Sequence, residues 1–127
     1  MIRERALKVV LVLVGLLFSA AIYPLMGGLR DPAHSDTGDT MMMSLYFALG
    51  VFLLIAVRNV SAHRSVIAFA AWSSFAHAIT MSIQGFEMPS ERTGFLVGSG
   101  VLVVIGIALI LLAPERELEQ RTAVPAA

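Results

Sequence analysis

Four polar residues within one apolar stretch, Ser73, His77, Thr80 and Gln84, are the main candidates for chemistry in this sequence. They are spaced four, three and four residues apart, so in an α-helix they share one face. His77 is the only titratable member, and an imidazole in this setting could relay protons, ligate haem iron or bind a metal ion. The alternative is a neutral imidazole that hydrogen-bonds to neighbouring groups, so that the face makes contacts between helices.

A second ligand for a cofactor at His77 is not evident. The other histidines, His34 and His63, fall in two different polar connections. A methionine could serve instead, although methionine in helices more commonly fills packing space, and the candidates are Met41, Met42, Met43 and Met81. We therefore assign no metal site and no catalytic residue, and the cofactor stays open.

Tyr46 is the candidate partner of His77. Each lies about two turns from the end of its own apolar stretch on the same side of the membrane, so the two side chains could meet. Tyr46 is therefore included in the candidate interior face.

Other sites of chemistry are missing. The chain has no cysteine, which removes disulfides, thiolate metal ligands and a thiol nucleophile. It has no Walker loop, dinucleotide glycine fingerprint, Gly-x-Ser-x-Gly elbow or His-Glu-x-x-His pair, so catalysis is disfavoured. Nine Lys plus Arg balance nine Asp plus Glu, and this neutrality argues against nucleic-acid binding.

The elements that must position these residues are apolar helices. Hydrophobic residues make up 57% of the 127 residues, and four stretches, 9–29, 40–57, 65–86 and 94–113, contain no Asp, Glu, Lys or Arg. About 20 helical residues cross the hydrocarbon core of a bilayer, and backbone polar groups must pair within it. We expect one all-α membrane domain over residues 1–127: an antiparallel bundle of four transmembrane helices over about 6–29, 40–58, 64–86 and 94–113, with a polar cytoplasmic tail over 114–127.

The first helix carries two local signals. Basic residues precede it and Ser19-Ala20-Ala21 resembles a signal-peptidase site, but the apolar run continues to Leu29, so we expect an uncleaved helix. Pro24, together with Gly27 and Gly28, should kink or end this helix near the outer surface.

Basic residues predict the orientation, because translocated segments tolerate few of them. The two connections on the predicted outer side hold only Arg30 and Arg92. The amino terminus, the middle connection and the carboxyl tail hold seven: Arg3, Arg5, Lys8, Arg58, Arg64, Arg116 and Arg121. Both ends are therefore predicted to lie in the cytoplasm.

The last apolar stretch is rich in glycine. Gly94 and Gly98 form a small-xxx-small pair, which lets helix backbones approach closely. The pair could serve packing within the bundle or self-association, and we favour packing within the bundle.

Several segments resemble a family of small uncharacterised bacterial four-helix membrane proteins. The resemblance spans nearly the whole chain and is most specific at Ala71-Trp72-Ser73-Ser74-Phe75-Ala76-His77-Ala78, with further matches at Arg3-Glu4-Arg5-Ala6-Leu7-Lys8, Met43-Ser44-Leu45-Tyr46 and Ala56-Val57-Arg58-Asn59. More distantly, the plan is similar to DoxX-like four-helix membrane proteins. A shared plan does not transfer an activity.

The resemblance implies a protein of the bacterial inner membrane and directs attention to Trp72, Ser73, Ser74 and His77. It also implies a histidine where Phe95 stands and a proline where Val60 stands. The missing second imidazole weakens any mechanism that uses two histidines.

Three functions remain open. The leading hypothesis is a non-enzymatic bundle that binds a partner or a lipophilic molecule, such as an accessory subunit of a larger membrane complex. The second is a transporter or channel subunit, which would need a homo-oligomer because four short helices enclose little pathway. The third is a membrane oxidoreductase that uses His77 with a bound cofactor or quinone.

Overall fold

The computed structural model describes residues 2–114, and these are helical apart from short connections. In chain order the elements are α1 (Ile2–Ser19), α2 (Ile22–Arg30), a short 3-10 helix η1 (Pro32–His34), α3 (Thr37–Ala56), α4 (Arg64–Glu87) and α5 (Arg92–Leu112). In the described part of the chain four segments are long and apolar enough to cross a membrane, with α1 and α2 together forming the first. The prediction of an all-α protein with four potential spans is confirmed. The predicted polar tail lies, after Pro114, outside the described residues.

The first span is broken between α1 and α2, one turn before the proline that causes the break. Pro24 has no backbone N–H, so it cannot bond to the carbonyl of Ala20, four residues earlier, and its ring crowds that carbonyl. The Ala20 carbonyl instead accepts from the N–H of Tyr23 at 3.1 Å, and the N–H of Ala21 donates to the carbonyl of Phe18 at 3.0 Å. These tighter bonds redirect the chain before α2 begins.

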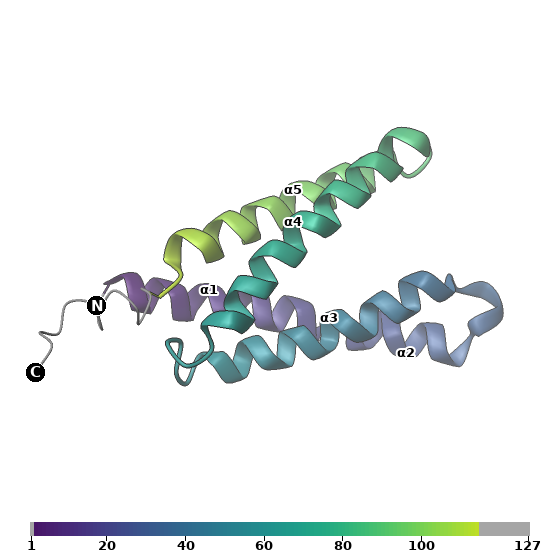
Figure 1. Cartoon of the computed structure of the whole chain (residues 1–127). Helices are drawn as coiled ribbons and strands as arrows, with labels where there is room; N and C mark the ends of the chain where they lie inside the picture. Colours follow the sequence, from purple (N-terminus) through teal and green to yellow (C-terminus); the bar gives the residue numbers. More distant parts are fainter. Residues whose placement is uncertain (1, 115–127) are drawn as a thin grey trace, which may run out of the picture.

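The helices pack as two pairs (Figure 1). α1 and α2 lie along α3, and we call these three elements the first hairpin; α4 and α5 lie along each other and form the second hairpin. The two hairpins meet at the end that holds the α3–α4 connection and diverge toward the connections over residues 31–36 and 88–91 (Figure 1). The fold is therefore closed at one end and open at the other.

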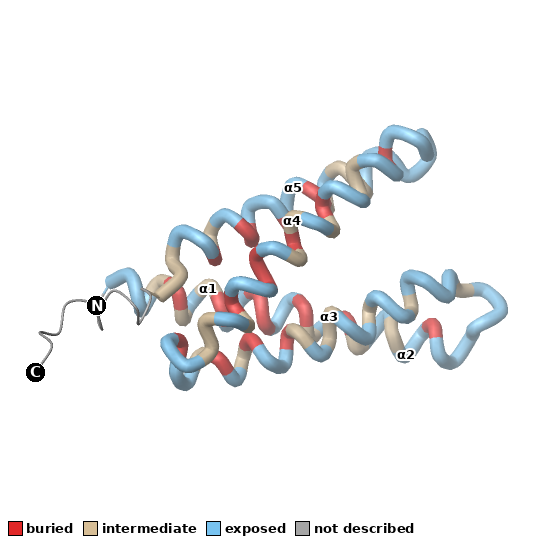
Figure 2. The backbone as a smooth tube through the Cα atoms, viewed as in Figure 1, coloured by how far each residue is buried: buried red, intermediate tan, exposed pale blue. Residues whose placement is uncertain are grey.

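The core lies where the hairpins meet (Figure 2). Its fully buried side chains come from α1, α3, α4 and α5 and include Leu7, Leu11, Leu53, Ile67 and Leu109. Toward the open end most of the first hairpin is exposed (Figure 2).

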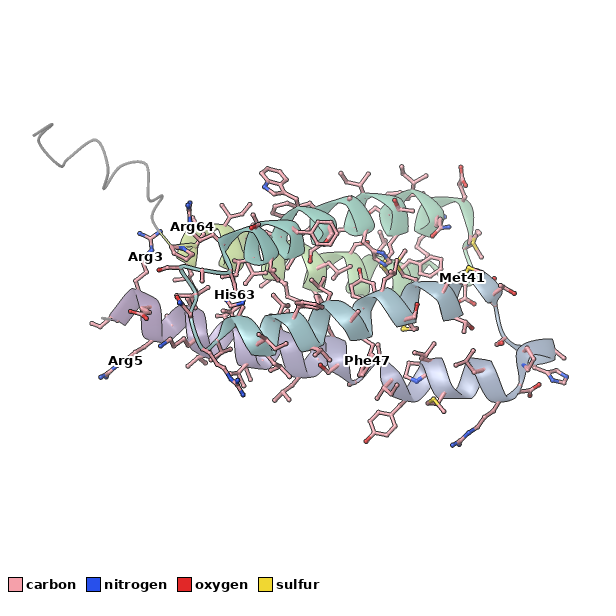
Figure 3. All side chains as sticks on the ribbon, turned by 60° about the horizontal axis from the view of Figure 1, so that its bottom comes forward. Arg3, Arg5, Met41, Phe47, His63 and Arg64 are labelled. Atoms are coloured by element: carbon pink, nitrogen blue, oxygen red, sulfur yellow. The ribbon has the colours of Figure 1, made fainter. Side chains whose placement is uncertain are left out.

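Two arginine side chains form hydrogen bonds between helices at the closed end. Arg3 Nη2 donates to the carbonyl of Ala113 at 2.9 Å, and Arg64 Nε donates to the carbonyl of Pro114 at 3.2 Å. Both side chains lie at the same end of the molecule (Figure 3). Carbonyl groups at the end of a helix lack partners within that helix and carry partial negative charge, so guanidinium groups suit them well. These bonds tie the starts of α1 and α4 to the end of α5.

Glycines allow close contact within both hairpins, but they face different neighbours. A Cβ atom on Gly50 would lie 2.5 Å from the backbone nitrogen of Ser19 and 2.8 Å from the carbonyl oxygen of Gly15, so α1 and α3 touch backbone to backbone. In the second hairpin, a Cβ on Gly106 would lie 2.6 Å from a ring carbon of Phe75. There the missing side chain makes room for an aromatic ring.

Candidate functional site

An aromatic contact joins the two hairpins at the depth where they begin to separate. The rings of Tyr46 in α3 and His77 in α4 stand edge to face, with centroids 5.2 Å apart and planes at 85°. Phe18 of α1 also meets the ring of Tyr46, with centroids 4.9 Å apart. Such edge-to-face pairs are favourable beyond their buried area. Three helices therefore contribute to one row of rings, and Phe18 was not among the candidates from the sequence.

The remaining members of the predicted polar face form bonds within their own helix or none. Ser73 Oγ donates to the carbonyl of Ala70 at 3.2 Å, and Thr80 Oγ1 donates to the carbonyl of Ala76 at 3.1 Å. Ser73 and His77 are half-buried, whereas Thr80 and Gln84 are exposed. That the whole face binds a ligand or another helix stays a prediction.

The exposure of Thr80 and Gln84 follows from the divergence of the hairpins. Gln84 is seven residues from His77, which is two turns along α4 and only about 20° around it. On α3, Asp39 bears the same relation to Tyr46, because it lies seven residues before it. We call the surface formed by these residues and one methionine the open face: Asp39, Met42 and Tyr46 of α3 with His77, Thr80 and Gln84 of α4.

Several polar atoms of the open face have no partner within the described residues. Neither the Tyr46 hydroxyl, the His77 ring nor the Gln84 amide makes a hydrogen bond to another residue of 2–114. By contrast, Ser99 of α5, buried between the helices of the second hairpin, donates to the carbonyl of Ala78 at 3.0 Å. Polar groups at membrane depth normally find partners in neighbouring helices. Within the described residues the buried Ser19 Oγ of α1 also lacks a partner, but the open face differs in that its unpaired groups lie on two neighbouring helices.

Sequence reasoning missed Ser99, and only a weak signal could have found it. A serine in an otherwise apolar helix is expected to bond to some backbone carbonyl, but the sequence does not say which helix supplies it. Asp39 was also missed as a site residue, because it lies in the first turn of α3 and its role depends on which helix lies beside α3.

The side chains of residues 71–78, the segment most specific for the family resemblance, have different surroundings. Trp72 is 64% exposed and touches only Phe75 among aromatic partners in the described chain. Ser74 is buried and donates to the carbonyl of Ala70 at 2.7 Å, and His77 reaches Tyr46. The segment therefore does not gather its polar side chains into one cluster.

The two glycines of the small-xxx-small pair differ in their surroundings. A Cβ on Gly98 would lie 2.7 Å from the terminal methyl carbon of Met81, whereas a Cβ on Gly94 would meet nothing within 4 Å. Gly98 therefore supports packing of α5 against α4. Self-association through Gly94 remains a prediction.

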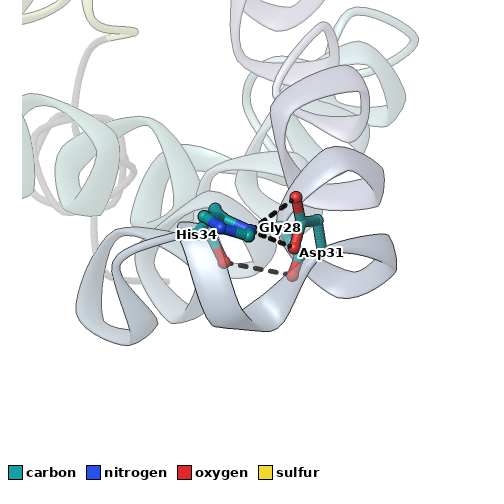
Figure 4. A network of polar contacts seen from close by, with 4 residues as sticks. Gly28, Asp31 and His34 are labelled. Atoms are coloured by element: carbon teal, nitrogen blue, oxygen red, sulfur yellow. Dashed lines mark hydrogen bonds and ion pairs between the residues drawn. The ribbon is translucent and has the colours of Figure 1, made fainter.

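The three histidines lie in different parts of the structure and make different contacts. His34 lies 2.9 Å from a carboxylate oxygen of Asp31 in the connection between α2 and α3 (Figure 4), and His63 Nδ1 lies 2.8 Å from the carbonyl oxygen of Asn59 at the closed end. Within residues 2–114 no three His, Asp or Glu side chains gather as a metal site would require. The structure does not bring a second histidine to His77.

A separate shallow groove runs along the second hairpin. It has a volume of about 420 Å³ and its lining, mainly apolar, includes Phe75, Ile79, Ile83, Phe86 and Val103. A surface of this kind suits lipid chains, and it lacks the polar atoms of the open face.

Comparisons with known proteins give one match. No curated protein and no solved structure matches the chain. The match to a family covers residues 2–123, which is nearly all of the sequence. The chain therefore belongs to the family of unknown function DUF6632.

Proposed function

We propose that the protein lies in a bacterial inner membrane as an antiparallel four-helix protein with both ends in the cytoplasm. The described basic residues support this orientation: Arg3, Arg5, Lys8, Arg58 and Arg64 belong to the closed end, which also holds the α3–α4 connection (Figure 1). The open end holds Arg30 and Arg92 with five acidic residues. Segments rich in Lys and Arg stay on the cytoplasmic side.

Single cysteines test this orientation, because the native chain has none. Ser35 lies in the outer connection and Ser61 in the connection between α3 and α4. In intact cells, a thiol reagent that does not cross membranes should label the Ser35→Cys variant and leave the Ser61→Cys variant unlabelled until the membrane is opened. Labelling of the Ser61→Cys variant from outside would reverse the proposed orientation.

Within that membrane the protein acts, in our proposal, as a non-enzymatic binding subunit whose open face receives a lipophilic molecule or a helix of a larger complex. One observation carries this function: the Tyr46 hydroxyl, the His77 ring and the Gln84 amide have no hydrogen-bond partner in the described chain. An unpaired polar group in an apolar medium costs about 1–3 kcal/mol by protein mutational data. A bound partner with hydrogen-bonding groups would remove that cost.

A native mass spectrum of the protein in its mildest workable detergent, with a parallel absorption scan, tests this function. Extra mass from a second protein or from a small molecule supports it. A mass of the chain alone, or of whole multiples of it, together with failure of the cross-linking experiment below, would contradict it.

Cross-linking locates the occupant. A photoreactive p-benzoylphenylalanine in place of Gln84 should capture it in native membranes. The matched control carries the same residue in place of Leu111, which is 68% exposed on α5. Capture that is equal at both positions would mean that the open face has no special occupant, because both positions then report only the surrounding lipid.

A further inference from the structure

We propose that the open face binds an amphiphile with an ammonium head group and a single apolar tail, with its head at Asp39 and its tail leading toward Tyr46 and His77. This inference rests on the proposed function and specifies the class of ligand.

The first argument is the charge of Asp39. The ion pairs of the described chain, Lys8 with Glu4 and His34 with Asp31, leave Asp39 without a basic partner in residues 2–114. Its side chain is exposed and makes no hydrogen bond to another residue of 2–114, whereas its backbone N–H donates to Asp36 Oδ1 at 3.0 Å. The carboxylate is therefore available to an external cation, and the charged form is the stronger hydrogen-bond acceptor.

The second argument is the charge around Asp39. The open end carries five acidic residues, Asp31, Asp36, Asp39, Glu87 and Glu91, against two arginines. One of these arginines, Arg92, donates from Nε to the carbonyl of Gly85 and from Nη2 to the carbonyl of Phe86, each at 3.1 Å. The local field attracts cations and repels phosphate or sulfate head groups. An ammonium amphiphile fits this field and an anionic lipid does not.

The third argument is the composition of the surface below Asp39. Tyr46 lies seven residues along α3, or about 10 Å deeper. Its ring, the His77 ring and the flexible side chain of Met42 offer polarisable apolar contacts, and aromatic rings also attract cations. Phe18, which is 4% exposed, ends the open face on the side of α1. The surface thus changes from anionic to aromatic along the direction in which an amphiphile would lie.

The test uses three probes with the same tail: dodecylammonium, dodecanol and dodecyl sulfate, each added to the full chain in uncharged maltoside micelles. Binding is followed through the NMR signals of the His77 ring. Dodecylammonium should shift these signals in a saturable way, and its apparent affinity should exceed that of the other two probes by about tenfold or more.

Variants of the acidic residues supply the controls. Asp39→Asn should weaken dodecylammonium binding about tenfold, and Asp39→Glu, which keeps the charge, should restore most of it. Glu91→Gln is the matched control: Glu91 is an acid at the start of α5 whose side chain makes no capping bond. It removes the same charge from the open end without touching the proposed head-group site, so it should weaken binding much less than Asp39→Asn does. Helix content by circular dichroism verifies that each variant is folded.

Two results would overturn the inference, and they differ in what they say of the proposed function. Equal affinity for all three probes, with no effect of Asp39→Asn, would reject the ammonium ligand while leaving the open face as a binding site. No response of His77 to any probe, with no capture from position 84 in membranes, would reject the proposed function as well.

Discussion

The glycines that let helices pack closely have different neighbours in the two hairpins. In the first hairpin α1 and α3 approach most closely at Gly50, where a Cβ would meet the backbone of Ser19 and Gly15. In the second hairpin Gly85, Gly98 and Gly106 face side chains of the opposing helix. Helices in lipid associate through close packing and hydrogen bonds, because lipid tails are as apolar as their side chains. The contact at Gly50 should therefore tolerate an added methyl group less well than the glycines of the second hairpin.

The largest effect is expected for Gly50→Ala. The new Cβ would lie 2.5 Å from the backbone nitrogen of Ser19, and relief requires α1 to move away from α3. Overpacking commonly costs about 1–3 kcal/mol, and a backbone neighbour places this variant at the upper end. The free energy of unfolding, measured by titration with dodecyl sulfate and followed by circular dichroism, should fall accordingly. An unchanged midpoint would show that the close approach of α1 and α3 is wrong.

A smaller loss is expected for Gly106→Ala. Here the neighbour is the ring of Phe75, whose nearest carbon would lie 2.6 Å from the new Cβ. The ring can rotate away from its preferred angle at a cost of about 1 kcal/mol without moving either backbone. The same titration should place this variant between the native protein and Gly50→Ala. A loss as large as that of Gly50→Ala would remove the proposed difference between the hairpins.

Gly98→Ala should change stability by less than about 0.5 kcal/mol, because the methyl end of Met81 is flexible and can turn aside. Gly94→Ala is its control, since a Cβ there meets nothing within 4 Å. If Gly94→Ala destabilises or dissociates the protein in membranes more than Gly98→Ala does, then Gly94 belongs to an interface between chains.

The smallest effect on stability is expected where the hairpins touch. Tyr46→Phe keeps the ring that meets His77 and Phe18, and the lost hydroxyl has no partner in the described chain, so the unfolding free energy should change little. The NMR signals and titration of the His77 ring should nevertheless change, because its polar neighbour is gone. Unaltered His77 signals would argue against the contact between Tyr46 and His77.

Much of the candidate site could be anticipated from local spacing. The interval of seven residues between His77 and Gln84 fixes their common face in any α-helix, and the depth of Tyr46 allowed it to meet His77. The interval could not show that Thr80 and Gln84 would be exposed, because exposure depends on the angle between the hairpins. Phe18 and Asp39 were missed for the same reason: their roles depend on which helices are neighbours.

The sequence by itself determined the number of potential spans and the place where the first one breaks. Charges are too costly within the bilayer to interrupt a span, and a proline disturbs the hydrogen bonds of the turn before it. Both effects act within a few residues, so a charged residue or a proline such as Pro24 produces them whatever the rest of the chain does. Only the tertiary structure decided that the helices form two hairpins, which glycines lie in contact, and that the hairpins part beyond Tyr46 and His77. Those features depend on how well the surfaces of two helices fit together, and these surfaces come from residues far apart in the sequence. The order of apolar residues along one helix does not show which other helix its surface fits.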